Sequence, residues 1–149
     1  MDVFYLYLII GGMPEAVDVY LKTNDLAKVA EVHEKIIRLY KTDFSKYEIR
    51  YKLKLQEIYD AMPGQLDQKN KRFQLNCIGK GMSYDRVAND FLWLKDAGVV
   101  IPVYNINEPK LPLVISENRN LFKLFCSDVG LLTSRYSNQV KIAILNKDK

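Results

Sequence analysis

The sequence predicts a mainly α-helical protein of the α+β class, in which a helical segment is followed by a winged helix-turn-helix unit with a small β-hairpin wing. Three observations predict this fold. Apolar residues recur every three and four positions over several stretches, which is typical of amphipathic helices. Capping and helix-breaking residues flank those stretches. Two segments rich in β-branched or apolar residues, 99–106 and 121–126, follow the last of these helices and are joined by a loop, as in a hairpin.

The composition is that of a globular protein. Of the 149 residues, 48% are hydrophobic and 27% are charged, so a sizeable core is expected. The most apolar run, Val3–Ile10, is eight residues long, whereas a membrane span needs about 20. Asp2 stands where a secretory signal would carry basic residues. We therefore expect this run to be a core segment, and the protein to be cytoplasmic and without a membrane partner.

The first part of the chain contains two predicted helices. One begins at Pro14 and extends to about Leu21. Proline lacks a backbone N–H, and the first residue of a helix has no intrahelical partner for that group, so proline suits this position. Asn24 or Asp25 caps the other, which ends at a break over residues 42–45. Its apolar face is the clearest in the sequence and comprises Leu26, Val29, Ala30, His33, Ile36, Ile37 and Tyr40.

The region from Arg50 to Cys126 has the element order of a winged helix. An amphipathic helix over residues 51–62 is expected to end at Pro63, because proline removes a helical hydrogen bond. Alternating apolar residues over 73–78 predict a short strand. The helix that follows would be the recognition helix, and the hairpin would be the wing.

The predicted recognition helix is well defined at both ends. Ser83 can cap it, and Gly98 can end it in a left-handed conformation. Its polar face carries three acids and two bases, which disfavours direct reading of a DNA major groove. These charged residues are Asp85, Asp90, Asp96, Arg86 and Lys95.

Basic residues flank this helix more than they cover it. Residues 69–149 carry 13 bases and 7 acids, against 9 bases and 11 acids in residues 1–68. Such an arrangement favours contact with a nucleic-acid backbone. The alternative, which stays open, is that these basic residues belong to the solvated face of a structural winged helix that packs on other domains. The candidate contact residues are Lys69, Lys71, Arg72, Lys80, Arg86, Lys110, Arg119 and Lys123.

We find no set of residues that would form a catalytic or metal site. The segment around Gly79 and Lys80 lacks the first glycine and the final Ser or Thr of a P-loop. Cys77 and Cys126 are far apart and have no CxxC partner, so buried thiols are expected. His33 lies in an apolar helical pattern, which favours a packed side chain. We therefore expect no enzyme activity and no cofactor in this chain.

Five ordered motifs resemble the prokaryotic AAA-type ATPases that carry a C-terminal domain of unknown function. Together they extend over about residues 5–135, and the set is far more specific than any one motif. The motifs are Gly-Gly-Met-Pro-Glu-Ala-Val at 11–17, Tyr-Lys-Thr-Asp-Phe-Ser-Lys-Tyr at 40–47, Asn-Lys-Arg-Phe at 70–73, Trp-Leu-Lys-Asp-Ala-Gly at 93–98, and Phe-Lys-Leu at 122–124 followed by Asp-Val-Gly-Leu-Leu at 128–132.

This resemblance implies a division into three parts. Residues 1–48 would be the end of the ATPase lid region, residues 49–127 a winged-helix domain, and residues 128–149 the shortened start of a restriction-nuclease-like domain. No residue matches the Walker motifs, so ATP and magnesium would belong to the ATPase domain that this chain lacks. That domain and the nuclease-like domain would be its partners.

The leading hypothesis is a non-catalytic binding or coupling module of an AAA-type ATPase, with DNA as one candidate target. The alternative is a scaffold for protein interaction or oligomerisation that does not bind DNA. Apolar surface at residues 3–10 and 142–145 would then drive self-association.

Overall fold

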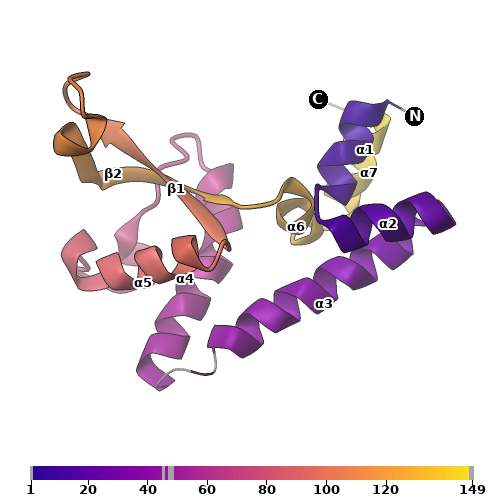
Figure 1. Ribbon diagram of the computed structural model, residues 1–149, viewed down its shortest axis with the longest axis horizontal. Coiled ribbons are helices and arrows are strands. Elements are labelled where there is room, and N and C mark those ends of the chain that lie inside the picture. The colour runs from indigo at the N-terminus through magenta and orange to yellow at the C-terminus, as the bar shows by residue number, and fades with distance from the viewer. Residues whose placement is uncertain (1, 45, 47–48, 148–149) are drawn as a thin grey trace. The chain divides into compact units, whose positions relative to one another are not determined.

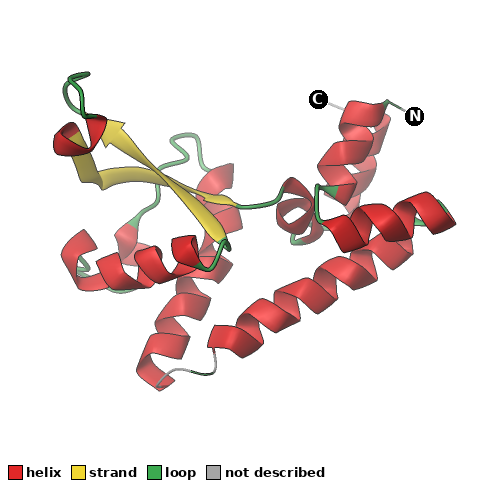
Figure 2. Ribbon diagram, viewed as in Figure 1, coloured by secondary structure: helices red, strands yellow, loops and turns green. Residues whose placement is uncertain are grey.

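The protein is mainly α-helical, as the sequence predicts. The computed structural model describes residues 2–44, 46 and 49–147. Within these residues there are seven α-helices and one antiparallel sheet of two strands (Figure 2). No described helix is both long enough and apolar enough to cross a membrane.

The chain forms two compact units. The first unit combines Met1–Asp43 with Cys126–Lys149, and the second comprises Phe44–Phe125. This division differs from the three parts expected from the sequence, because the tail after residue 127 belongs to the same unit as the N-terminal helices. The second unit is therefore continuous in sequence, and the first is not.

The first unit contains five helices (Figure 1). They are α1 (Val3–Ile10), α2 (Pro14–Thr23), α3 (Leu26–Phe44, whose last residue belongs to the second unit), α6 (Val129–Ser134) and α7 (Asn138–Asn146). Pro14 begins α2 as predicted, and the Asp25 carboxylate accepts a hydrogen bond from the Ala27 N–H at the start of α3. The helix α3 continues to Phe44, into the predicted break at 42–45, of which residue 45 lies outside the described residues. A core cluster of Ile10, Ala16, Val29 and Val32 joins α1, α2 and α3.

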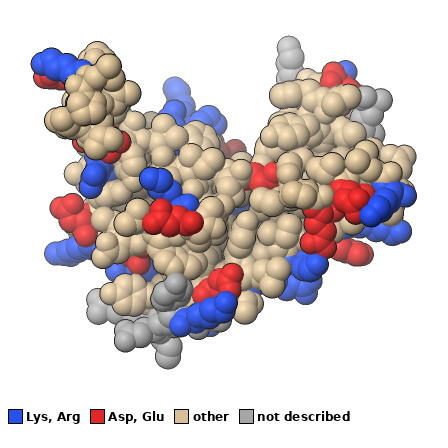
Figure 3. All heavy atoms as spheres, in the orientation of Figure 1, with Lys and Arg blue, Asp and Glu red and all other residues tan. Residues whose placement is uncertain are grey.

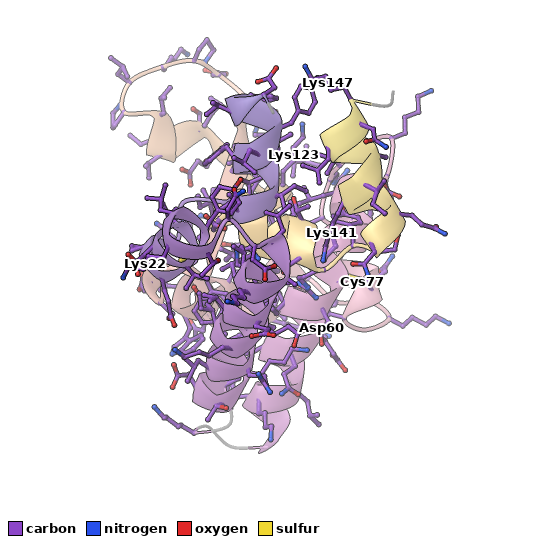
Figure 4. All side chains as sticks on the ribbon, turned by 90° about the vertical axis from the view of Figure 1, so that its right-hand side faces the viewer. Lys22, Asp60, Cys77, Lys123, Lys141 and Lys147 are labelled. Atoms are coloured by element: carbon purple, nitrogen blue, oxygen red, sulfur yellow. The ribbon has the colours of Figure 1, made fainter. Side chains whose placement is uncertain are left out.

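The run Val3–Ile10 is only partly the core segment that we expected. Ile9 and Ile10 are buried, but Val3 and Phe4 are 78% and 59% exposed. The helix packs against α6 and α7, and α1 and α7 lie side by side in Figure 1. Lys147, which follows α7, forms an ion pair with Asp2 (3.3 Å) near the start of α1 (Figure 4).

The Asp128 carboxylate joins the two separated segments of the first unit. Its Oδ2 accepts a hydrogen bond from the Gly12 N–H (2.6 Å), and its Oδ1 accepts one from the Leu131 N–H (2.8 Å), where Asp128 caps α6. Gly11 has a φ of 74°, and a Cβ at this position would lie 2.2 Å from Asp128 Oδ1. A Cβ at Gly130 would lie 2.4 Å from the Ile10 carbonyl oxygen. The packing therefore requires glycine at both positions.

The second unit consists of two long helices, a hairpin and two short 3-10 segments. In chain order these are α4 (Ile49–Asp67), η1 (Leu75–Cys77), α5 (Tyr84–Asp96), β1 (Val100–Ile106), η2 (Leu113–Ser116) and β2 (Glu117–Cys126, whose last residue belongs to the first unit). The order of helix, helix and hairpin agrees with the sequence expectation. Gly98 has a φ of 69° after α5, as its predicted role in ending that helix requires.

Two predictions for this unit were wrong. The helix α4 continues through Pro63 for another turn, because Met62 and Leu66 are buried and hold that turn in the core. The expected strand over 73–78 is not formed. The Phe73 N–H does bond to the Phe122 carbonyl (2.9 Å) in β2, but the Gln74 N–H bonds to the Gln65 side chain (2.9 Å), and the chain then turns into η1.

We predict that the variant Gly130→Ala will lower the free energy of unfolding by about 1–3 kcal/mol, because the added methyl group overlaps the Ile10 carbonyl. Urea denaturation followed by circular dichroism would measure this. The matched control is Gly64→Ala in α4, where an added Cβ meets nothing within 4 Å. That variant should be neutral or more stable by up to about 1 kcal/mol. Equal midpoints for the two variants would contradict the proposed role of Gly130.

Candidate nucleic-acid interface

All eight predicted contact residues belong to the second unit, but four of them already have partners there. Lys71 Nζ donates to the Leu66 carbonyl (2.9 Å), and Arg72 Nη2 donates to the Asn120 carbonyl (3.2 Å). Two ion pairs, Lys110–Glu108 (2.6 Å) and Arg119–Glu117 (3.8 Å), neutralise residues of the hairpin. The two ion pairs offset the positive charge of Lys110 and Arg119, whereas Lys71 and Arg72 keep their charge and are only held in place by a neutral carbonyl.

The other four candidates are Lys69, Lys80, Arg86 and Lys123. They are exposed, and within the described part of the chain none of them forms an ion pair. They lie on different elements: Lys69 follows α4, Lys80 precedes α5, Arg86 is on α5, and Lys123 is on β2. On the face that Figure 3 shows, positive and negative side chains alternate over the surface.

Two of the eight residues meet at one groove beside the hairpin. The groove has a volume of about 440 Å³, and Arg72 and Lys123 both line it. Its other lining residues are Asn70, Val103, Tyr104, Asn105, Leu121 and Phe122. Lys69, Lys71, Lys80, Arg86, Lys110 and Arg119 are not among the residues that line it.

A second, smaller groove of about 220 Å³ shares Arg72 with the first. Its other lining residues are Phe73, Gln74, Leu75, Asn76, Met82 and Asn120. Neither groove is lined by an acidic residue, although the chain contains 18 Asp and Glu. The two grooves together therefore present two cations and five side-chain amides, which are groups that contact phosphate oxygens in protein–nucleic-acid complexes.

The sequence reasoning missed these amides. Asn70 stands between Lys69 and Lys71, and Asn120 follows Arg119, so asparagines alternate with bases in both segments. That alternation was the available signal. Bringing the two segments together required the hydrogen bonds of Phe73 and Arg72 to β2, which the sequence does not reveal.

An aromatic cluster holds the groove in place. The Phe122 ring contacts Phe73 (centroid distance 5.6 Å), Phe91 (5.0 Å), Tyr84 (5.6 Å) and Tyr104 (5.8 Å). The hydroxyl groups of Tyr84 and Tyr104 are 2.5 Å apart. Burial, followed by this hydrogen bond, raises the pKa of Tyr104. The tyrosine therefore stays neutral and adds no negative charge to the groove wall.

The exposed face of α5 differs in one respect from the prediction. Asp90, expected among its solvated acids, is only 4% exposed and lies 3.7 Å from Lys54 of α4. Burial raises the pKa of Asp90, and the nearby Lys54 opposes this effect. Asp85 and Asp96 remain exposed, so two acids and the bases Arg86 and Lys95 share the outer face of this helix. The face is neutral, and the groove remains the more favourable surface for an anion.

Other groups with possible chemistry are dispersed. Among the described residues, no three His, Cys, Asp or Glu side chains are grouped as a metal site would require. Cys126 is buried, as expected, and burial raises the pKa of its thiol. Cys77 was expected to be buried and is exposed instead, because it lies in η1 and not in a strand.

His33, the one histidine of the chain, is a packed residue as the sequence suggests. It is 2% exposed, and its Nε2 lies 3.0 Å from the Ile10 carbonyl oxygen. The Ile10 carbonyl oxygen can only accept a hydrogen bond, so Nε2 of His33 carries the proton in the neutral ring. Burial lowers the pKa of His33 below its usual 6.5, against the smaller opposing effect of the Ile10 carbonyl.

The titration of His33 should therefore appear in the stability of the first unit. An unfolded chain binds this proton more readily than the folded one, so the stabilisation is complete above pH 6.5 and is lost as the pH falls through the folded pKa. We predict an imidazole pKa below 6.5 by NMR, and a free energy of unfolding that falls as the pH decreases from about 6.5 through the folded-state pKa. His33→Gln, which can still donate to Ile10 but does not titrate, should remove this dependence. An NMR pKa at or above 6.5 would refute the prediction.

Comparison with known proteins identifies one family. A family model described as "Domain of unknown function (DUF8612)" matches residues 1–140, which include the whole of the second unit and most of the first. No curated protein and no solved structure matches the chain. Because the match covers far more than half of its length, the chain belongs to the DUF8612 family.

Proposed function

We propose that this chain is a non-catalytic binding module whose second unit contacts the phosphate backbone of a nucleic acid. The observation that carries the proposal is the pair of grooves beside the hairpin, which hold Arg72, Lys123 and five amides without an acidic residue. Phosphate oxygens accept hydrogen bonds from such groups, and a carboxylate in the same place would repel them.

The charge of the two units supports the same surface. Residues 44–125 contain 13 Lys and Arg and 9 Asp and Glu, so the second unit carries a net charge of +4. The remaining residues contain 9 of each and are neutral. The entire excess of positive charge is therefore in the unit that contains the grooves, and this excess would attract a polyanion.

The two grooves beside the hairpin would contact the phosphate backbone of the nucleic acid without recognising its bases. The neutral outer face of α5 offers two acids beside its two bases, and this favours backbone contact over insertion of the helix into a major groove. In a protein of the AAA-type class that the sequence resembles, such a unit would couple an ATPase to its nucleic-acid target. The chemistry of ATP hydrolysis would then lie outside this chain.

Duplex DNA should bind with an affinity that falls as salt increases. For the two phosphate contacts that Arg72 and Lys123 would make, the logarithm of the binding constant should fall with the logarithm of the salt concentration with a slope of about −2. We predict that Lys123→Ala reduces the magnitude of this slope by about one, since Lys123 is exposed and has no ion pair among the described residues. Fluorescence anisotropy of a labelled short duplex, at several salt concentrations, measures both values.

Lys28→Ala is the matched control, because Lys28 is an exposed lysine of the neutral first unit. It should leave the affinity and the slope unchanged. Absence of binding at micromolar protein in low salt would reject the proposed function. Equal losses of DNA affinity in Lys123→Ala and Lys28→Ala would show that the grooves are not the DNA-binding surface.

A second candidate function is self-association through the hairpin tip. The loop between β1 and β2 exposes four apolar side chains, Leu111 (88%), Leu113 (46%), Val114 (63%) and Ile115 (81%). Internal hydrogen bonds order this loop: Ser116 Oγ donates to the Glu108 carbonyl (2.6 Å), and the Asn107 N–H donates to the Ser116 carbonyl (3.0 Å). Exposed apolar clusters of this kind mark interaction sites.

We predict that the double variant Leu111→Ser, Ile115→Ser shifts an associated species to monomer without loss of stability, because both side chains are largely exposed. Multi-angle light scattering over a concentration series tests this, with thermal unfolding as the check on folding. A wild-type protein that is monomeric at every concentration would count against self-association and would leave the nucleic-acid proposal unaffected.

A further inference from the structure

The first unit contains a cavity that the proposed function does not use. Its volume is about 420 Å³, within the range of pockets that bind small molecules. One side is formed by α3 and the other by α7, with single residues from α1 and α6. Among its lining residues are Val29, His33, Glu34, Ser134, Lys141 and Leu145.

Part of the cavity wall is apolar and already buried. Val29 is 1% exposed and Ile9 is 7% exposed, and Leu145 of α7 is partly buried. An aliphatic group in contact with these residues would lose its water-exposed surface, which favours binding. The wall therefore suits a ligand with a short aliphatic side chain.

Opposite charges line the cavity without neutralising one another. Glu31 and Glu34 come from α3, whereas Lys141 projects from α7 (Figure 4). Within the described residues none of these three side chains has an ion-pair partner. A ligand that carries an ammonium group and a carboxylate could satisfy both signs at once.

His33 contributes a hydrogen-bond acceptor to the same wall. The residue is 98% buried and lines the cavity, and its Nε2–H is committed to the Ile10 carbonyl. In this tautomer Nδ1 has a lone pair, and among the described residues no hydrogen bond to Nδ1 is formed. A ligand N–H could donate to that nitrogen.

We propose that this cavity binds a free aliphatic α-amino acid. Lys141 would contact the ligand carboxylate, Glu34 and His33 would accept hydrogen bonds from its ammonium group, and Val29 and Leu145 would cover its side chain. Ser134 and Asn138 supply further hydrogen-bonding groups at the α6 and α7 side. The site is separate from the hairpin grooves, so it does not depend on nucleic-acid binding.

Titration of the full ¹⁵N-labelled chain with L-leucine, followed by NMR, tests the proposal. We expect chemical-shift changes at millimolar leucine that concentrate on residues 26–34 and 138–145. L-leucinamide lacks the carboxylate and should bind at least about tenfold more weakly, because a charge-assisted hydrogen bond is lost. Lys141→Gln should weaken leucine binding by a similar factor and leave leucinamide binding unchanged.

Two controls make the result decisive. Lys28→Gln alters an exposed lysine of α3 that does not line the cavity, and it should bind leucine like the wild type. The amide spectrum of each variant reports whether the unit is folded. Absence of shifts at millimolar leucine, shifts located elsewhere, or equal leucine affinity in the wild type and Lys141→Gln would each overturn the proposal.

Discussion

The organisation of the first unit depends on the two hydrogen bonds that the Asp128 carboxylate accepts. One comes from Gly12 and the other from Leu131, so a single side chain fixes the turn before α2 and the start of α6. Gly12 and Asp128 are 116 residues apart in the chain. The glycines at 11 and 130 permit the close approach, because a Cβ at either one would occupy the space of atoms already present. The tail is thereby held in the unit that the N-terminal helices form, and its helix α7 forms one wall of the cavity of about 420 Å³.

In the second unit, tertiary structure determines which positive charges are available. Half of the predicted basic contacts donate to backbone carbonyls or pair with glutamates two residues away. Arg72 has a double role, since its bond to Asn120 fixes it beside β2 and also leaves it in the wall of two grooves. The side-chain amides around Arg72 are therefore as important for binding an anion as the number of lysines.

The sequence predicts the elements of this protein better than their extents and neighbours. The start of α2 at Pro14 and the end of α5 before Gly98 follow from the local conformational rules of proline and glycine. The helix α5 begins directly after Ser83 as predicted, although the Ser83 side chain forms no capping hydrogen bond. The extra turn of α4 beyond Pro63 does not follow from such rules, because it is stabilised by burial of Met62 and Leu66 in a core that only the folded unit creates.

The candidate site shows the same limit. The basic residues were identifiable one by one, but the meeting of Arg72 and Lys123 in one groove was not, since a hairpin and a hydrogen bond from Phe73 bring these distant segments together. Asp90 and Cys77 each have the opposite of the expected exposure. Asp90 is buried beside Lys54, and the Cys77 thiol is exposed in η1. Periodicity alone cannot foresee a buried carboxylate whose partner lies on another helix.

The distribution of two rare residues gives each unit its own spectroscopic probe. The one tryptophan, Trp93, belongs to the second unit, where its ring lies 5.6 Å from that of Phe44 in an edge-on contact. The one histidine belongs to the first. Indole fluorescence and imidazole proton resonances therefore report on different halves of the same polypeptide, so that loss of order in either half can be followed in the intact chain without labels or truncation.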